Sequence, residues 1–125
     1  MDLSMKILVV DDFATMRRIV KNVLRQIGFT NIVEADDGST ALGVLKKDKI
    51  DLIISDWNMP KVNGLELLKA VRGDESTKNL PFIMVTAEAQ KDSVVQAVQA
   101  GVSNYVVKPF TAEALKEKLE KVFSK

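Results

Sequence analysis

A short apolar run at residues 52–55, followed at once by Asp56, constrains the fold of this chain more than any other feature. The run is rich in isoleucine and is bounded by polar residues, which is typical of a strand buried on both faces. Such strands belong to parallel sheets that helices cover on both sides. Pro60 and Gly64 break the chain soon afterwards. We therefore expect Asp56 at the carboxyl end of a buried strand, where open α/β sheets bind ligands.

Similar short runs recur along the chain and alternate with helical patterns. The other predicted strands lie at residues 7–10, 32–35, 82–85 and 105–107. About five strands alternating with about five helices predict a parallel sheet with right-handed crossovers. The leading fold class is α/β, a flavodoxin-like (βα)5 doubly wound parallel sheet with strand order 2-1-3-4-5.

The predicted helices have one apolar side and carry recognisable ends. The first places Ile19 on its apolar side and Arg17 on its solvated side, and Gly28 ends it. Asn63 and Thr111 can cap later helices. Further residues expected on buried helix faces are Val20, Val23, Leu24 and Ile27 in the first helix, and Leu65, Leu68 and Val71 in the third.

Composition excludes several functional classes. The 125 residues predict a single domain over 1–125 that needs no stabilising crosslink. The absence of cysteine and histidine removes disulfides, thiolate nucleophiles and the usual general base. Lys and Arg number 18 against 17 Asp and Glu, which argues against nucleic acid as a partner. No apolar run approaches the roughly 20 residues of a membrane span, and the start lacks a signal-peptide pattern. We expect a cytoplasmic protein.

Polar side chains stand where four of the five predicted strands end. Strand one ends in Asp11 and Asp12, strand three in Asp56, strand four in Thr86 and strand five in Lys108. In the order 2-1-3-4-5 these four strands are consecutive neighbours, and the carboxyl ends of parallel strands share one edge. Three carboxylates, one hydroxyl and one ammonium are therefore predicted to converge on one cleft.

This group of side chains favours metal-assisted phosphoryl chemistry. Three carboxylates and one lysine do not balance, so the site must bind protons or a cation. Oxygen ligands from few protein groups suit Mg²⁺, which keeps several waters. Lys108 and Thr86 can hold the oxygens of a phosphoryl group that joins the metal. No serine, cysteine or histidine competes in the cleft, so Asp56 is the predicted nucleophile, with Asp11 and Asp12 holding the metal.

Each of these residues also has a purely structural interpretation. Asp12 can cap the helix that follows it, Asp56 can orient a turn, and Lys108 before a proline can be a solvated charge. Gly64 is interpreted as helix punctuation, and Trp57 as a partly exposed cover beside the site. The functional hypothesis is preferred because all the polar strand ends fall on one edge of one sheet.

Five blocks of sequence together resemble the receiver domains of bacterial response regulators, and in particular those of chemotaxis. The blocks are residues 9–13, 15–18, 55–60, 84–89 and 105–110. Within them, the acidic pair, Asp56, Thr86 and the Lys-Pro pair each stand at the strand end where such a domain has them. The resemblance extends from Lys6 to the last helix.

The resemblance implies roles for individual residues. Asp56 is expected to accept a phosphoryl group from a histidine kinase. Asp12, Asp56 and the main-chain carbonyl of Asn58 would bind Mg²⁺, with Asp11 acting through water. Asn58 and Glu88 flank the site and would influence self-dephosphorylation. The chain is then a phosphoacceptor that assists its own reactions, not an enzyme acting on other substrates.

The resemblance also implies an output. Lys108 would contact the phosphoryl group, and the bond between Lys108 and Pro109 is expected to be cis. Thr86 and Tyr105 would relay the phosphoryl group's presence, and the phosphorylated form would bind the flagellar motor switch. A phosphatase is a further candidate partner, and the chain is expected to be a monomer.

Strand alternation predicts which surface changes. Lys108 and Val106 should lie on one side of strand five, and Tyr105 and Val107 on the other. The partner surface is therefore predicted to combine strand five with the helices before and after it. Its candidate contacts are Tyr105, Val107 and Lys118.

Three alternatives remain open. A phosphatase of the haloacid dehalogenase type also uses aspartate and Mg²⁺, but its nucleophile would end strand one, with a second aspartate two positions on. Here Phe13 occupies that position. A flavodoxin-like electron carrier would need a phosphate-binding loop where Asp11 and Asp12 stand. The third alternative is a single-domain receiver of another two-component pathway.

Overall fold

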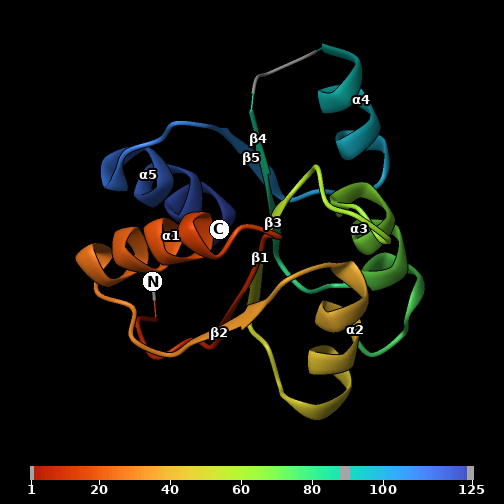
Figure 1. Ribbon diagram of the computed structural model, residues 1–125, viewed down its shortest axis with the longest axis horizontal. Coiled ribbons are helices and arrows are strands. Elements are labelled where there is room, and N and C mark those ends of the chain that lie inside the picture. The colour runs from red at the N-terminus through yellow and green to blue at the C-terminus, as the bar shows by residue number, and fades with distance from the viewer. Residues whose placement is uncertain (1, 88–90, 124–125) are drawn as a thin grey trace.

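Ten elements alternate along the chain in the computed structural model, which describes residues 2–87 and 91–123. The strands are β1 Ile7–Val10, β2 Ile32–Ala35, β3 Leu52–Asp56, β4 Phe82–Thr86 and β5 Asn104–Val107. The helices are α1 Ala14–Ile27, α2 Gly38–Lys47, α3 Gly64–Gly73, α4 Lys91–Gln99 and α5 Ala112–Phe123. All strand pairs are parallel, and the sheet order is β2-β1-β3-β4-β5, which confirms the predicted fold (Figure 1).

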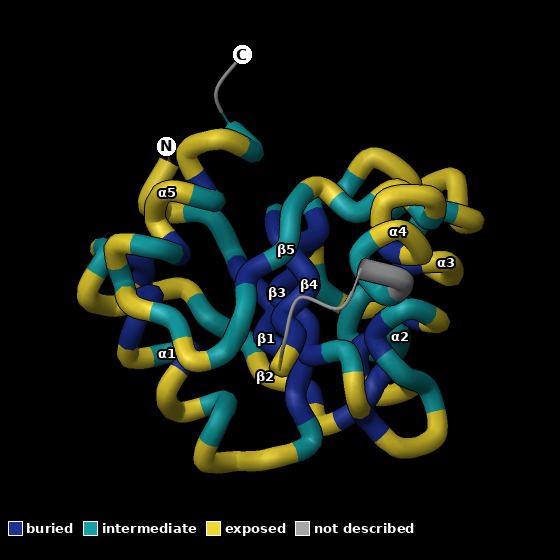
Figure 2. Tube along the Cα trace, turned by 90° about the horizontal axis from the view of Figure 1, so that it is seen from above, coloured by how far each residue is buried: buried dark blue, intermediate teal, exposed yellow. Residues whose placement is uncertain are grey.

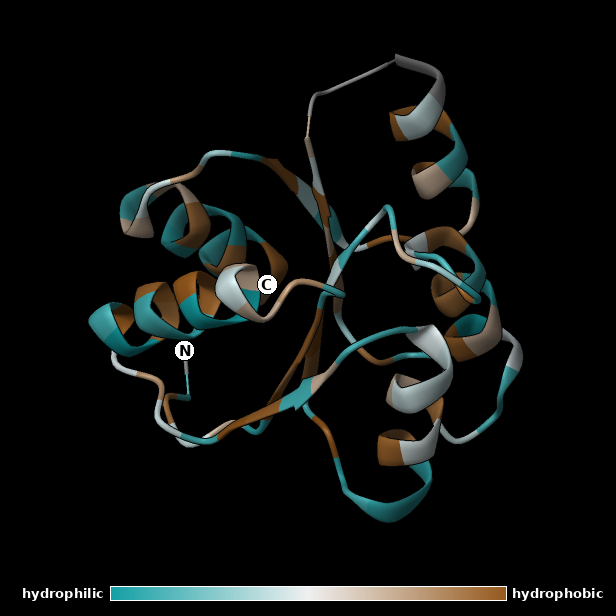
Figure 3. Ribbon diagram, in the orientation of Figure 1, coloured by the Kyte–Doolittle hydropathy of each residue, from teal (hydrophilic) through white to brown (hydrophobic). Residues whose placement is uncertain are grey.

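The sheet is the middle of three layers. Helices α1 and α5 cover one face, and α2, α3 and α4 cover the other (Figure 1). Successive residues of β1 alternate between the two apolar cores: Ile7 and Val9 pack toward α1 and α5, and Leu8 and Val10 toward α2 and α3. The strands form the buried centre in Figure 2, and the inner helix faces are hydrophobic in Figure 3. This two-sided burial explains the near-continuous apolar runs.

Helix α1 shows where the predicted pattern holds and where it shifts. Val20, Val23 and Leu24 are buried, but Ile19 is 44% exposed, because it lies at the edge of the apolar stripe. Asp12 does not cap this helix: the N-cap position is Phe13, which provides no side-chain cap. Gly28 ends the helix at φ 125°, a left-handed conformation that favours glycine.

The beginning of α3 is built more tightly than the sequence suggested. The Asn63 side chain accepts from the main-chain amide of Glu66, and the Glu66 side chain accepts from the main-chain amide of Asn63. These two hydrogen bonds form a complete capping box. Gly64 is more than punctuation, because a Cβ there would overlap the Asp56 carbonyl and lie 2.8 Å from the sulfur of Met84. Leu67 is buried and Leu65 only half-buried, a shift of the predicted face. The end of β3 and the start of α3 are thus in direct contact.

Helix α5 follows its prediction closely. Thr111 caps it by accepting from the Ala114 amide, and Leu115 and Leu119 are buried against α1 and the sheet. Val122 and Phe123 pack against the same core. Among residues 2–87 and 91–123, none of the helices has the length and apolar character to cross a membrane.

Candidate functional site

The strand register brings Asp11 and Asp56 to the same edge of the sheet. Val10 of β1 stands opposite Ser55 of β3, so the next residue on each strand is an aspartate. Oxygen atoms of the Asp11, Asp12 and Asp56 carboxylates all lie within 4.8 Å of one another. Asp11 and Asp56 are 3% and 7% exposed, so little water screens their repulsion. The predicted carboxylate cluster is present.

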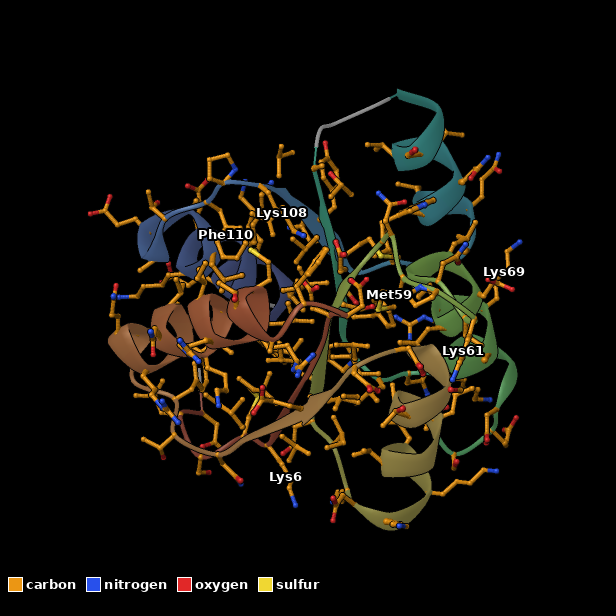
Figure 4. The ribbon with its side chains drawn as sticks, in the orientation of Figure 1. Lys6, Met59, Lys61, Lys69, Lys108 and Phe110 are labelled. Atoms are coloured by element: carbon orange, nitrogen blue, oxygen red, sulfur yellow. The ribbon has the colours of Figure 1, made fainter. Side chains whose placement is uncertain are left out.

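Lys108 is the cation that faces this cluster. Its Nζ lies 3.0 Å from Oδ1 of Asp56 and 3.6 Å from Oδ2 of Asp11. The residue follows β5, and its amide donates to the Thr86 carbonyl at 2.7 Å, which places it at the end of β4 as well. The bond between Lys108 and Pro109 is cis, as predicted. Figure 4 shows Lys108 near Phe110 on the α5 side, with Met59 and Lys61 on the other side of the sheet.

One ammonium does not neutralise three carboxylates, and the electrostatics of Asp11 reflect this. Burial raises the pKa of the Asp11 carboxyl above its usual value, and the neighbouring Asp56 charge raises that pKa further. The Phe13 amide, which donates to Oδ1 of Asp11 at 3.0 Å, and the Lys108 charge act in the opposite direction. Folding therefore holds Asp11 in a position that disfavours its charged form unless another cation is bound.

Asp12 supplies a direct sign that the cluster suits a metal. Its Oδ1 is buried and has no hydrogen-bond partner among the described residues. A buried carboxylate oxygen without a partner is costly to keep in a folded protein. A hard cation bound by three carboxylates would satisfy this oxygen and offset the repulsion. The residues present therefore fit Mg²⁺.

Comparison with known proteins assigns the chain to a family. The family model of the response regulator receiver domain matches residues 7–120. This chain belongs to that family. The match includes every strand, and the acidic pair, Asp56, Thr86 and Lys108 all lie within it.

Individual relatives agree with this assignment. The chemotaxis protein CheY of Pseudomonas aeruginosa is 61% identical over 121 residues, covering 97% of this chain and 98% of the relative. Chemotaxis protein CheY-3 of Vibrio cholerae is 59% identical over 122 residues, covering 98% of this chain and 94% of the relative. The solved structure of Vibrio cholerae CheY4 superposes with a TM-score of 0.89 at 36% identity, covering 96% of this chain and 99% of that one.

Other predicted site residues of this receiver domain lie around the cluster. Thr86 is 7% exposed at the end of β4, paired in register with Val107. Asn58 is exposed two residues after Asp56. Trp57 is half-buried and packs against the α2–α3 core, as a partial cover would. Glu88 lies outside the described residues.

The residues that are predicted to contact the partner lie together on β5 and α5. Tyr105 packs against the core on the α3 side and Val106 against the opposite core, which confirms the predicted alternation along β5 for these two residues. The Nζ of Lys118 in α5 lies 5.2 Å from the centre of the Tyr105 ring, within cation–π range. Tyr105, Val107 and Lys118 line one surface hollow with Pro109 and Phe110.

Sequence reasoning missed one residue that contacts the site. Arg17 was assigned to a solvated helix face, yet its Nη1 donates to the main-chain carbonyl of Asp11 at 2.6 Å. Its Nε donates to Glu34 at 3.1 Å. The only signal in the sequence is a basic residue one turn and a half after the acidic pair, a spacing that many surface helices share.

Proposed function

We propose that this protein is a phosphorylation-activated, single-domain response regulator of chemotaxis. Asp56 accepts the phosphoryl group, a histidine kinase donates it, and the phosphorylated form binds the flagellar motor switch. The observation that carries the proposal is the Lys108 ammonium 3.0 Å from Asp56, beside three carboxylates whose oxygens lie within 4.8 Å of one another. The names of the chemotaxis relatives support the pathway.

The transfer itself is a displacement at phosphorus. A carboxylate oxygen of Asp56 attacks, a P–O bond forms, and the P–N bond to the kinase imidazole breaks, leaving a neutral imidazole once it has taken up a proton. Lys108, freed from part of its pairing with Asp56, remains within reach to hold a phosphoryl oxygen. The hydroxyl of Thr86, on the adjacent strand, is the proposed second donor.

Asp11, Asp12 and Asp56, with the main-chain carbonyl of Asn58, would hold Mg²⁺. When bound, Mg²⁺ supplies positive charge that offsets the negative charge of the phosphoryl oxygens. Asp11 and Asp12 therefore prepare the site by keeping oxygen ligands directed at one point despite their mutual repulsion.

The proposed signal travels from Thr86 to Tyr105. A hydrogen bond from Thr86 to a charged phosphoryl oxygen is worth roughly 1.5–3 kcal/mol, enough to shift a two-state equilibrium by about tenfold to a hundredfold. Movement of Thr86 would leave space beside β5 into which the Tyr105 ring can turn. That turn would remove the ring from Lys118 and reshape the hollow that both line.

A small acyl-phosphate donor tests the chemistry. With Mg²⁺ present, mass spectrometry of the labelled protein is expected to find the phosphoryl group on Asp56 alone, and Asp56→Asn is expected to take up none. Labelling that persists in Asp56→Asn would move the nucleophile to Asp11 or Asp12 and would favour the phosphatase alternative.

Partner capture tests the output. The phosphorylated parent is expected to retain the motor switch protein, and Tyr105→Ala is expected to lose this dependence while Asp56 still accepts phosphate. The same phosphorylation dependence in Tyr105→Ala would contradict the relay. Binding to a different two-component target, with no binding to the switch, would favour a receiver of another pathway.

A further inference from the structure

The Arg17 side chain links the end of β1 to β2 through contacts that are separate from the main-chain hydrogen bonds of the sheet. Its guanidinium donates from Nη1 to the Asp11 carbonyl at 2.6 Å and from Nε to Oε1 of Glu34 at 3.1 Å. The first contact lies directly after β1, and the second lies on β2. The side chain is only 18% exposed, so it is not a freely solvated charge. A planar guanidinium suits this double contact because its donors have fixed directions.

Glu34 is itself held by a second cation. Lys21, one helical turn after Arg17, donates from Nζ to Oε2 of Glu34 at 2.9 Å. The hydrogen bond from Lys21 is the largest cause that lowers the pKa of the Glu34 carboxyl, followed among the lowering causes by the one from Arg17. Glu34 is thus an ionised anchor on β2, and the Arg17 guanidinium is fixed in direction between it and Asp11.

The peptide unit between Asp11 and Asp12 is the part that Arg17 restrains. The Asp11 amide donates to the Ala35 carbonyl at 3.1 Å, which continues the β1–β2 ladder by one residue. The Asp11 carbonyl lies beyond that ladder and accepts from Arg17 instead. Because a peptide unit is planar, the orientation of this carbonyl also fixes the orientation of the whole peptide plane that leads into Asp12.

The direction of the Asp12 carboxylate depends on that peptide plane more than the directions of the Asp11 and Asp56 carboxylates do. Asp11 has a hydrogen bond from the Phe13 amide, and Asp56 has the Lys108 ammonium. Oδ1 of Asp12 is buried with no partner among the described residues. Its direction toward the cluster is therefore set mainly by the backbone that carries it.

We propose that Arg17 is a positioning residue of the metal centre. It holds the peptide between Asp11 and Asp12 so that the Asp12 carboxylate faces the other two, and the Glu34–Lys21 pair holds Arg17 in turn. This inference rests on the proposed function, since it concerns the same Mg²⁺ site. It adds residues from α1 and β2 that supply no ligand to the metal.

Mg²⁺ titration of the metal-free protein, followed by Trp57 fluorescence, tests the inference. Arg17→Met is expected to weaken Mg²⁺ binding by about tenfold to a hundredfold, the range found when residues that orient metal ligands are lost. Loss of a nearby positive charge would by itself tighten cation binding. The two explanations therefore predict opposite signs. Arg18→Met, at the exposed next position, is the matched control and is expected to bind Mg²⁺ as the parent does or slightly more tightly.

Further variants separate positioning from simple loss of stability. Arg17→Lys is expected to recover part of the affinity, since an ammonium can still donate to one of the two oxygens. Glu34→Gln, which keeps Arg17 and weakens its anchor by removing the negative charge, is expected to weaken Mg²⁺ binding less than Arg17→Met. In metal-free protein, the amide resonances of residues 11–13 are expected to shift in Arg17→Met and to stay in place in Arg18→Met.

The failures are distinguishable. Arg17→Met binding Mg²⁺ as tightly as Arg18→Met, in a parent that binds Mg²⁺ and accepts phosphate on Asp56, would overturn this inference alone. A parent that shows no saturable Mg²⁺ binding would overturn the metal site of the proposed function and this inference with it. If Arg17→Met does not fold, the Mg²⁺ affinities of Arg17→Lys and Glu34→Gln test the inference instead. An affinity for Mg²⁺ equal to that of the parent in both variants would overturn it.

Discussion

The two ends of β3 carry an aspartate each, and the fold uses them in opposite ways. Asp51, just before the strand, accepts the Lys6 amide at 2.8 Å on its carboxylate and donates its own amide to the Lys6 carbonyl at 2.8 Å. Asp56, at the other end, accepts no main-chain donor on its carboxylate among the described residues and faces two other carboxylates and one ammonium.

The difference shows that the two edges of this parallel sheet carry charged side chains of different kinds, paired ones at the amino edge and the candidate site at the carboxyl edge. At the amino edge, Asp51 accepts the Lys6 amide, and Asp48 pairs with the Lys6 ammonium at 3.5 Å. At the carboxyl edge, three carboxylates share one lysine, and one oxygen of Asp12 has no described partner. Charge left unsatisfied in a folded protein costs stability, and a bound cation would reduce that cost at this edge.

The largest contrast is expected between the lysines of the two edges. Lys108→Met should slow phosphate acceptance by Asp56 from a small acyl-phosphate donor by about a hundredfold or more, because a preplaced donor to the reacting oxygens is lost. Lys6→Met should leave that rate unchanged and alter the free energy of unfolding by no more than about 0.5 kcal/mol, since it ends an exposed pair. Rates measured by Trp57 fluorescence decide, and a parental rate in Lys108→Met would remove the contrast.

Mg²⁺ should stabilise the folded protein only through residues at the carboxyl edge of the sheet. At a concentration one hundred times the dissociation constant, Mg²⁺ is expected to raise the free energy of unfolding by about 2.7 kcal/mol. Asp12→Asn should lose most of this gain, because it loses a ligand charge. Asp51→Asn should keep it, whatever its own effect on stability. Urea unfolding with and without Mg²⁺ measures both, and equal gains in the two variants would contradict the assignment of the site.

The pH dependence of stability should differ in sign between the two edges. Burial raises the pKa of Asp11, so between the unfolded and the folded pKa the metal-free folded state retains a proton that the unfolded state releases. The stability contributed by this group is therefore lost as pH rises from the unfolded pKa through the raised folded pKa. Asp11→Asn should thus be more stable than the parent at neutral pH without metal, and the difference should vanish below the unfolded pKa.

Asp74, which follows α3, provides the opposite case. Its carboxylate accepts the Ser76 amide at 2.9 Å, and this hydrogen bond lowers its pKa. Its contribution is present above the unfolded pKa and is lost as pH falls through the folded pKa. Asp74→Asn should therefore be less stable than the parent at neutral pH. Thermal melts across pH compare the two variants, and shifts of the same sign at neutral pH would refute the contrast.

The smallest expected effect concerns the loop after β3. Lys61 has φ 64°, a left-handed conformation that is costly for a residue with a side chain. Lys61→Gly is expected to raise the free energy of unfolding by up to about 1 kcal/mol, with part of the relief offset by the entropy of glycine. At the amino edge, Lys49→Gly relieves no such strain and should lower stability. Chemical denaturation of both variants measures the sign, and destabilisation by Lys61→Gly would show that the loop is not strained there.

Local pattern was enough to predict the elements and the edge on which the polar residues meet. Residues 52–55 identify a strand buried on both faces without reference to any partner, because two-sided burial leaves an apolar run. Parallel order then brings Asp11 and Asp56 to the same edge, and the register of β1 with β3 confirms it. The caps Asn63 and Thr111 were also readable, since capping is a contact between near neighbours.

Only the tertiary structure decided the contacts between residues distant in sequence. The 3.0 Å approach of Lys108 to Asp56, the bond from Arg17 to the Asp11 carbonyl and the overlap that only Gly64 avoids depend on how three layers pack. The 44% exposure of Ile19, at the edge of the apolar stripe of α1, also depends on how that helix packs on the core. Sequence periodicity determines which face of an element is apolar, because that is a property of a few consecutive residues. It does not determine where the end of a long side chain lies, because that position is set by atoms from elements far along the chain.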